Sequence, residues 1–142
     1  MNLSDWRLFA IGSAGFAGPT AVLAKIGVAQ INSNLATLIR TVVILAVTAI
    51  IVAWRGEWEP VNRLSAKSVL FLCLSGLATG LSWLCYFRAL QLGPASQVAP
   101  IDKLSVVFVI LLAWLFLGEP VTWRIFVGGT LVVAGAVVLA IK

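Results

Sequence analysis

The sequence predicts an all-α integral membrane protein, and three observations support that prediction. Hydrophobic residues make up 61% of the chain and charged residues only 11%. The mean hydropathy is +1.08, and a soluble domain of 142 residues cannot bury so much apolar surface. The apolar residues also form long continuous runs, whereas the strands of a membrane β-barrel are short and alternate.

Five apolar runs are long enough to cross a hydrocarbon core of about 30 Å, which needs about 20 helical residues. We expect five transmembrane helices in a single domain over residues 1–142, at about 6–28, 34–54, 68–90, 96–117 and 121–141. The last turn is Gly118-Glu119-Pro120. We expect Glu119 to cap the positive N-terminal end of the fifth helix.

Small residues and prolines mark positions for helix packing or for hinges. Gly18 precedes Pro19 in the first run, and Pro19 removes one hydrogen bond from the middle of that helix, so we expect a kink there. Gly76 and Gly80 are four residues apart in the third run, a spacing that allows close backbone contact in lipid. Pro100 opens the fourth run, where proline suits a first helical turn.

Five charged residues are predicted to lie in the same half of the bilayer. Lys25 ends the first helix, Arg40 lies about two turns into the second, Arg88 lies near the end of the third, and Asp102 and Lys103 begin the fourth. Four positive charges and one negative charge give a formal sum of +3. A cluster of this sign from four helices can line a site for an anionic or zwitterionic ligand, such as a carboxylate or a phosphate.

Within this cluster, Arg40 and Asp102 are the sharpest candidates for specific chemistry. A guanidinium at that depth favours a planar acceptor, either Asp102 or a ligand anion. Asp102 and Lys103 are adjacent, so on a regular helix they point to different sides, and we expect the partner of Asp102 on another helix. As the one acid placed within the predicted spans, Asp102 is also the candidate for ion coupling.

Simpler interpretations remain for the same residues. Lys25, Arg88 and Lys103 can extend their ammonium or guanidinium groups to the lipid headgroups. Asp102 can favour the positive end of the fourth helix if Pro100 occupies its first turn.

No enzymatic constellation is apparent. The chain has no His, no cluster of metal ligands and no Gly-rich phosphate loop. We therefore expect no enzyme, no cofactor and no metal site, and no basic run interleaved with aromatic residues indicates nucleic-acid binding. The net charge of +5 concerns membrane orientation and anionic lipids instead.

Five spans place the two termini on opposite faces of the membrane, and the basic residues divide almost evenly between the faces. Five lie near the face of the N-terminus and five near the other, or three if Arg40 and Lys103 are discounted as buried. Such a chain can insert in both orientations, and two opposite copies would form an antiparallel homodimer of ten helices. The alternative is a single orientation, with the N-terminal face in the cytoplasm.

The residue pattern as a whole resembles the EamA-like half-repeat of the drug/metabolite transporter superfamily. The matching features are Lys25, Arg40, Tyr86-Phe87-Arg88-Ala89-Leu90, Ala99-Pro100, Leu117-Gly118-Glu119-Pro120, Gly128 and Gly135. Typical members are ten-helix chains built from two inverted five-helix halves. The resemblance implies that this chain corresponds to one half, which an antiparallel homodimer would complete, as a multi-pass protein of the bacterial inner membrane.

The resulting prediction is a small secondary transporter or exporter of anionic or zwitterionic metabolites. Its substrate-binding residues would be Arg40, Lys103, Lys25 and Arg88, with Asp102 for coupling or ion pairing, and its partners would be the substrate, membrane lipids and a second copy. Two alternatives stay open. The first is a flippase for an anionic lipid-linked headgroup, and the second is a non-catalytic membrane subunit that packs against a partner.

Overall fold

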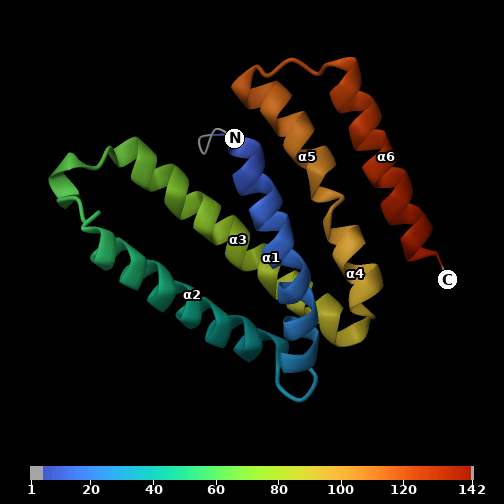
Figure 1. Cartoon of the computed structure of the whole chain (residues 1–142), viewed down its shortest axis with the longest axis horizontal. Coiled ribbons are helices and arrows are strands. Elements are labelled where there is room, and N and C mark those ends of the chain that lie inside the picture. The colour runs from blue at the N-terminus through green and yellow to red at the C-terminus, as the bar shows by residue number, and fades with distance from the viewer. Residues whose placement is uncertain (1–4, 142) are drawn as a thin grey trace. The chain divides into compact units, whose positions relative to one another are not determined.

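All elements in the described part of the chain are helical. The computed structural model describes residues 5–141 (Figure 1). In chain order its elements are α1 (Trp6–Gly27), α2 (Ser33–Arg55), the short 3₁₀ helix η1 (Val61–Arg63), α3 (Ala66–Leu92), α4 (Ala95–Asp102), α5 (Ser105–Leu112), the π-helical turn η2 (Ala113–Leu117) and α6 (Trp123–Ala140). Five stretches are long and apolar enough to cross a membrane, and α4, α5 and η2 together form the fourth. The predicted all-α fold with five transmembrane helices is therefore confirmed.

The ends of α2 are set by local sequence. The side chain of Asn32 accepts a hydrogen bond of 2.8 Å from an amide in the first turn. At the other end Gly56 has a positive φ of 67°. The amides of Gly56 and Glu57 donate to the carbonyls of Ala53 (3.2 Å) and Val52 (3.0 Å). This pair of bonds is the glycine C-cap that satisfies the last carbonyls and ends the helix.

Pro19 lies within α1, which stays helical on both sides of it, so the kink expected there stays a prediction.

The threonine hydroxyl groups inside the helices are satisfied by local hydrogen bonds. Threonine hydroxyls donate to the carbonyl four residues earlier, at 2.8–2.9 Å, in Thr20, Thr37, Thr41, Thr48, Thr79 and Thr130. Each threonine hydroxyl of the described helices therefore donates a hydrogen bond within its own helix and does not face lipid as an unsatisfied donor.

The fourth span, expected at about residues 96–117, runs over Ala95–Leu117 and is irregular within those bounds. Pro100 carries no amide hydrogen, so one backbone bond of a regular helix cannot form. Immediately afterwards the amides of Lys103 and Leu104 donate to Pro100 (3.0 Å) and Ile101 (2.9 Å), three residues back instead of four. This tight turn separates α4 from α5, and the span ends in the wider turn of η2.

The start of α6 also differs from the expectation. The helix begins at Trp123, and the side chain of Thr122 accepts a bond of 3.4 Å from the amide of Ile125. Thr122 is therefore the N-cap, and the expected capping by Glu119 is wrong because Glu119 lies three residues before that cap. A hydroxyl directly before the helix reaches the amides of the first turn, which fixes the start.

The described residues form two compact units. The central unit is Ala24–Gln91, and the terminal unit contains the described residues up to Leu23 and those from Leu92 onward. In the central unit the core lies where the ends of α1 and α3 meet the start of α2. Val28 and Leu90 are fully buried and Phe87 is 3% exposed. The other buried residues of this unit are Ala24, Ser33, Ala36 and Thr37.

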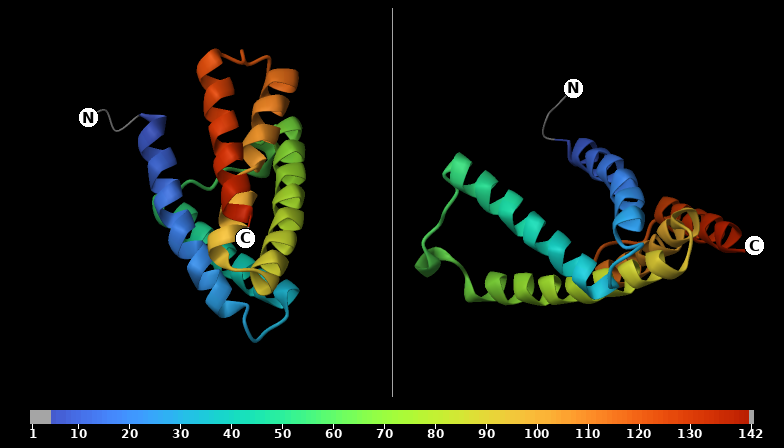
Figure 2. Two further views of the ribbon diagram at one scale, coloured as in Figure 1. Left: turned by 90° about the vertical axis from the view of Figure 1, so that its right-hand side faces the viewer. Right: turned by 90° about the horizontal axis from the view of Figure 1, so that it is seen from below.

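In the terminal unit α6 runs back alongside α4 and α5 (Figures 1 and 2). The close approach depends on one glycine. A Cβ atom added to Gly129 would lie 3.1 Å from Cδ1 of Ile110 on α5, so the missing side chain gives Ile110 its space. Ala136 is buried on α6, with 4% exposed. Small residues thus allow the contact, as is typical of helices packed in lipid.

Candidate functional site

Arg40 lies against an aromatic ring in the central unit. Arg40 lies on the same face of α2 as the buried residues Ala36 and Thr37, four and three positions earlier, so it points toward α3. Its Cζ atom is 3.3 Å from the ring centroid of Trp83 and 5.9 Å from that of Phe87. The guanidinium therefore stacks on Trp83, in a cation–π contact.

Three aromatic residues of α3 support this stack. Trp83, Tyr86 and Phe87 are spaced three and four residues apart, so they share one helix face. The rings of Trp83 and Tyr86 meet edge to face with centroids 5.6 Å apart, and those of Trp83 and Phe87 are 5.8 Å apart. Because Phe87 is buried, the cluster joins Trp83 to the core of the unit.

The hydrogen-bond donors of Arg40 have no described acceptor within its own unit, Ala24–Gln91. Its described contacts in this unit are to aromatic rings, and it takes part in no hydrogen bond or ion pair described there. A guanidinium carries five N–H donors, and leaving them unsatisfied at membrane depth is costly. Arg40 thus has both the position and the chemistry to bind an anion.

Lys25 and Arg88 belong to the same unit, but their described hydrogen bonds are to groups at the end of α3. Lys25 Nζ donates to the carbonyl of Leu90 at 2.5 Å, and Arg88 Nη1 donates to Oε1 of Gln91 at 2.7 Å. Nε2 of Gln91 donates to the carbonyls of Val28 (3.4 Å) and Ile31 (3.1 Å). These bonds connect the ends of α1 and α3, and the predicted substrate contacts of Lys25 and Arg88 stay predictions.

Asp102 and Lys103 lie in the terminal unit and contact each other. Lys103 Nζ is 3.4 Å from Asp102 Oδ2, so the expectation that the two side chains point to different sides is wrong. The reason is the end of α4, because Lys103 lies in the tight turn after Pro100 and not in a regular helix. Arg40 belongs to the other unit, and its predicted pairing with Asp102 stays a prediction.

The glycines predicted to mediate packing make no close contact in the described chain. A Cβ atom added at Gly18, Gly76 or Gly80 would meet nothing within 4 Å. Their predicted role in packing stays a prediction.

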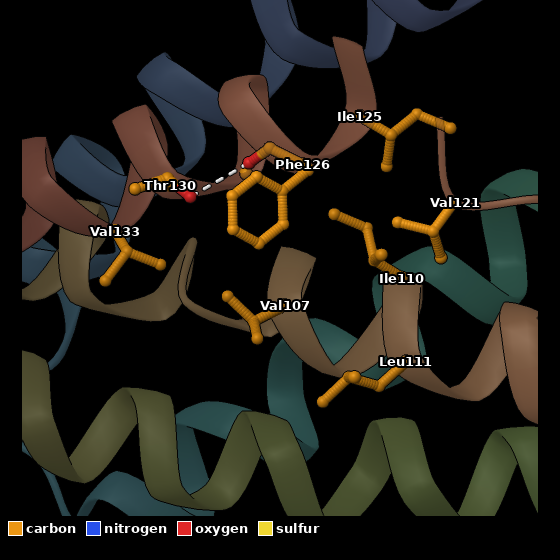
Figure 3. A pocket seen from close by; sticks show the side chains of 9 residues that line it. Val107, Ile110, Leu111, Val121, Ile125, Phe126, Thr130 and Val133 are labelled. Carbon is orange, nitrogen blue, oxygen red and sulfur yellow. Dashed lines mark hydrogen bonds between the residues drawn. The ribbon is translucent and has the colours of Figure 1, made fainter. Parts of the chain in front are cut away.

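An apolar hollow of the terminal unit is unsuited to a charged ligand. It has a volume of about 280 Å³ and lies between α5 and α6. Figure 3 shows aliphatic side chains and Phe126 pointing into it, while the Thr130 hydroxyl is bonded to the carbonyl of Phe126. A second, shallower groove is lined by Pro100, Lys103 and apolar residues of α6. No group of three His, Cys, Asp or Glu side chains able to bind a metal occurs among the described residues.

Comparison with known proteins agrees with the helix count and the residue pattern. The model of the EamA-like transporter family matches residues 5–141. The chain belongs to the EamA-like transporter family. Together with its five membrane-length helices, this membership makes the chain a multi-pass integral membrane protein.

Two relatives of this EamA-like chain are named as transport proteins. A Sinorhizobium sp protein described as an uncharacterized transporter in the cobO 3' region is 56% identical over 137 residues, which cover 96% of this chain and 97% of the relative. Solute carrier family 35 member G1 of Homo sapiens is 31% identical over 134 residues, which cover 94% of this chain and 36% of the relative. No solved structure matches the chain. The bacterial relative indicates an inner-membrane location.

Sequence reasoning identified Arg40 but missed Trp83. The sequence interpretation assigned Trp83 no role, although Trp83-x-x-Tyr86-Phe87 places three rings on one face of α3. That spacing, together with a lone arginine at similar depth on the preceding helix, was the signal available. In this EamA-like chain the aromatic face of α3 is the support on which Arg40 rests.

Proposed function

We propose that the chain transports a small organic anion or zwitterion across the membrane and that Arg40 binds the negative group of the substrate. The observation that carries this proposal is the state of Arg40. Its guanidinium is partly buried and stacked on Trp83, and its donors have no described acceptor within the central unit. A substrate carboxylate or phosphate would supply the missing acceptor and the opposite charge.

The distribution of charge in the central unit supports a substrate that carries an anionic group. The sequences of α2 and α3 contain no Asp or Glu. The acids of this unit, Glu57 and Glu59, lie in the loop between these helices, and Glu57 pairs with Arg55 at 2.8 Å. Because no helical acid of the unit opposes Arg40, a neutral or cationic substrate would leave this partly buried charge uncompensated.

The proposed working form is an antiparallel homodimer. One chain provides five membrane-length helices and buries few apolar residues, while most of its large hydrophobic side chains are exposed. The nearly even division of basic residues between the two faces favours insertion in both orientations. A second, inverted copy would supply ten helices in the symmetry that many transporters build within one chain.

The binding proposal is tested by thermal unfolding of the purified protein in detergent. Amino acids, carboxylates and phosphate would be screened for an increase in Tm, in wild type, Arg40→Ala and the loop variant Arg63→Ala. A ligand at 100 times its Kd stabilises the folded state by about 2.7 kcal/mol. We expect stabilisation by at least one anionic or zwitterionic compound in wild type and Arg63→Ala, and none in Arg40→Ala. The absence of any Arg40-dependent shift would sink the proposal.

A further inference from the structure

The Arg40–Trp83 stack restricts how a ligand can reach the guanidinium. A separation of 3.3 Å between Cζ and the ring centroid leaves no room for another atom between the two planes. Trp83 therefore covers one face of the guanidinium. The N–H donors lie in the plane of that group and point outward from its edge. That edge is the place where a ligand can accept hydrogen bonds from Arg40.

We propose that Trp83 is a positioning residue that holds Arg40 ready for a single carboxylate group, an inference that rests on the proposed transport function. A carboxylate is planar and accepts two parallel hydrogen bonds from the edge of a guanidinium. Trp83 fixes the plane of the guanidinium, while Phe87 and Tyr86 hold the indole in place. The conformational freedom of a long side chain is thereby lost before the ligand arrives, which favours binding.

Charge matching favours a monovalent carboxylate over a phosphate dianion. Arg40 contributes one positive charge at the stack. Lys25 and Arg88 of the same unit direct donors to other protein groups, Lys25 to the carbonyl of Leu90 and Arg88 to the side chain of Gln91. A dianion would bring a second negative charge without an equivalent partner into a region of low dielectric, which is costly.

A purely structural stack would stabilise the fold without any effect on ligand binding, so the test measures both. Purified full-length protein would be titrated with acetate, and in parallel with inorganic phosphate at matched ionic strength, and affinities would be derived from the ligand dependence of Tm. The variants are Trp83→Leu, Trp83→Phe, Arg40→Ala, the double variant Arg40→Ala/Trp83→Leu, and Trp58→Leu as the control on an exposed loop tryptophan.

We expect Trp83→Leu to weaken acetate binding about 10-fold and Trp83→Phe to weaken it less, because a phenyl ring still supports a cation. Trp58→Leu should bind acetate like wild type, phosphate should bind more weakly than acetate, and Trp83→Leu should have no further effect in the Arg40→Ala background. Trp83→Phe preserves an aromatic ring and keeps the test valid if Trp83→Leu does not fold.

The possible failures are distinct. Acetate binding that depends on Arg40 but not on Trp83 would overturn the role of Trp83 and leave the proposed function standing. Phosphate binding as tight as acetate binding would overturn the carboxylate class. If wild type bound neither ion, the carboxylate site at the stack would be wrong, and the proposed function would be decided by the wider screen with amino acids and other carboxylates.

Discussion

Lys25 and Gln91 each satisfy the end of the other's helix. The ammonium of Lys25, in the last turn of α1, binds the carbonyl of Leu90 in the last turn of α3. The amide of Gln91 on α3 binds the carbonyls of Val28 and Ile31, which follow α1. The last carbonyls of a helix have no partner within it, and near lipid they are costly to leave unsatisfied. Two side chains thus stabilise the junction at the core of the central unit.

Removing the Gln91 amide tests this interpretation. Gln91→Ala leaves two carbonyls without their donor and removes the acceptor of Arg88, so we expect a loss of about 1–3 kcal/mol in the free energy of unfolding. Gln30→Ala, an exposed glutamine in the turn after α1, is the matched control and should change stability little. Denaturant unfolding in detergent measures both. Equal stability of the two variants would contradict a role of Gln91 at the junction.

The residue-level features differ in how far sequence could predict them. Arg40 was predictable as a site residue because a charge two turns inside an apolar run is costly in a membrane and is therefore typical of a functional site. The contact of Lys25 with Leu90 was not, because the carbonyl that a lysine reaches depends on where a helix 65 residues later ends. The pairing of Asp102 with Lys103 was missed for a local reason, since the helix geometry used for the prediction stops at Asp102.

At the scale of elements, the fourth span shows where hydropathy is insufficient. Hydropathy identifies Ala95–Leu117 as one span, and this segment is long and apolar enough to cross a membrane. It carries no information on hydrogen bonding, so the tight turn after Pro100 and the π-helical turn of η2 were not predicted. Pro100 was recognised but was assigned to a first turn. The element in fact starts at Ala95, which places Pro100 inside α4.

The contact between α5 and α6 makes a testable distinction between two adjacent glycines. Gly129→Ala would place a Cβ 3.1 Å from Ile110 Cδ1, whereas Gly128→Ala meets nothing within 4 Å. Alanine is favoured over glycine in a helix by about 1 kcal/mol, so we expect Gly128→Ala to be neutral or stabilising. Gly129→Ala should be less stable than Gly128→Ala by about 1 kcal/mol because Ile110 must shift.

Shortening the side chain of Ile110 tests whether its contact with the added Cβ causes the lower stability of Gly129→Ala. Ile110→Val removes the Cδ1 atom, so Gly129→Ala should cost less in the Ile110→Val background than in wild type. Thermal unfolding of the four proteins closes the double-mutant cycle. Additive effects of the two substitutions would show that the glycine is not required for this contact.

At the scale of the whole molecule, one chain leaves most of its apolar surface uncovered. Seven hydrophobic residues are buried among those described, and the large side chains of the spans are mostly exposed. Composition alone predicted this class of protein, and the order of short motifs predicted its family, because both depend on the chain itself. What covers the exposed surface depends on lipid and on other copies, which one sequence does not specify.

The proposed transporter therefore depends on two chains inserted in opposite directions. The most direct measurement uses two reporters fused in turn to the C-terminus, alkaline phosphatase, which is active outside the cytoplasm, and green fluorescent protein, which is fluorescent inside it. Since the basic residues are nearly balanced between the faces, we predict substantial signal from both fusions in the same bacterial host. Signal from only one reporter would establish a single orientation and contradict the antiparallel homodimer.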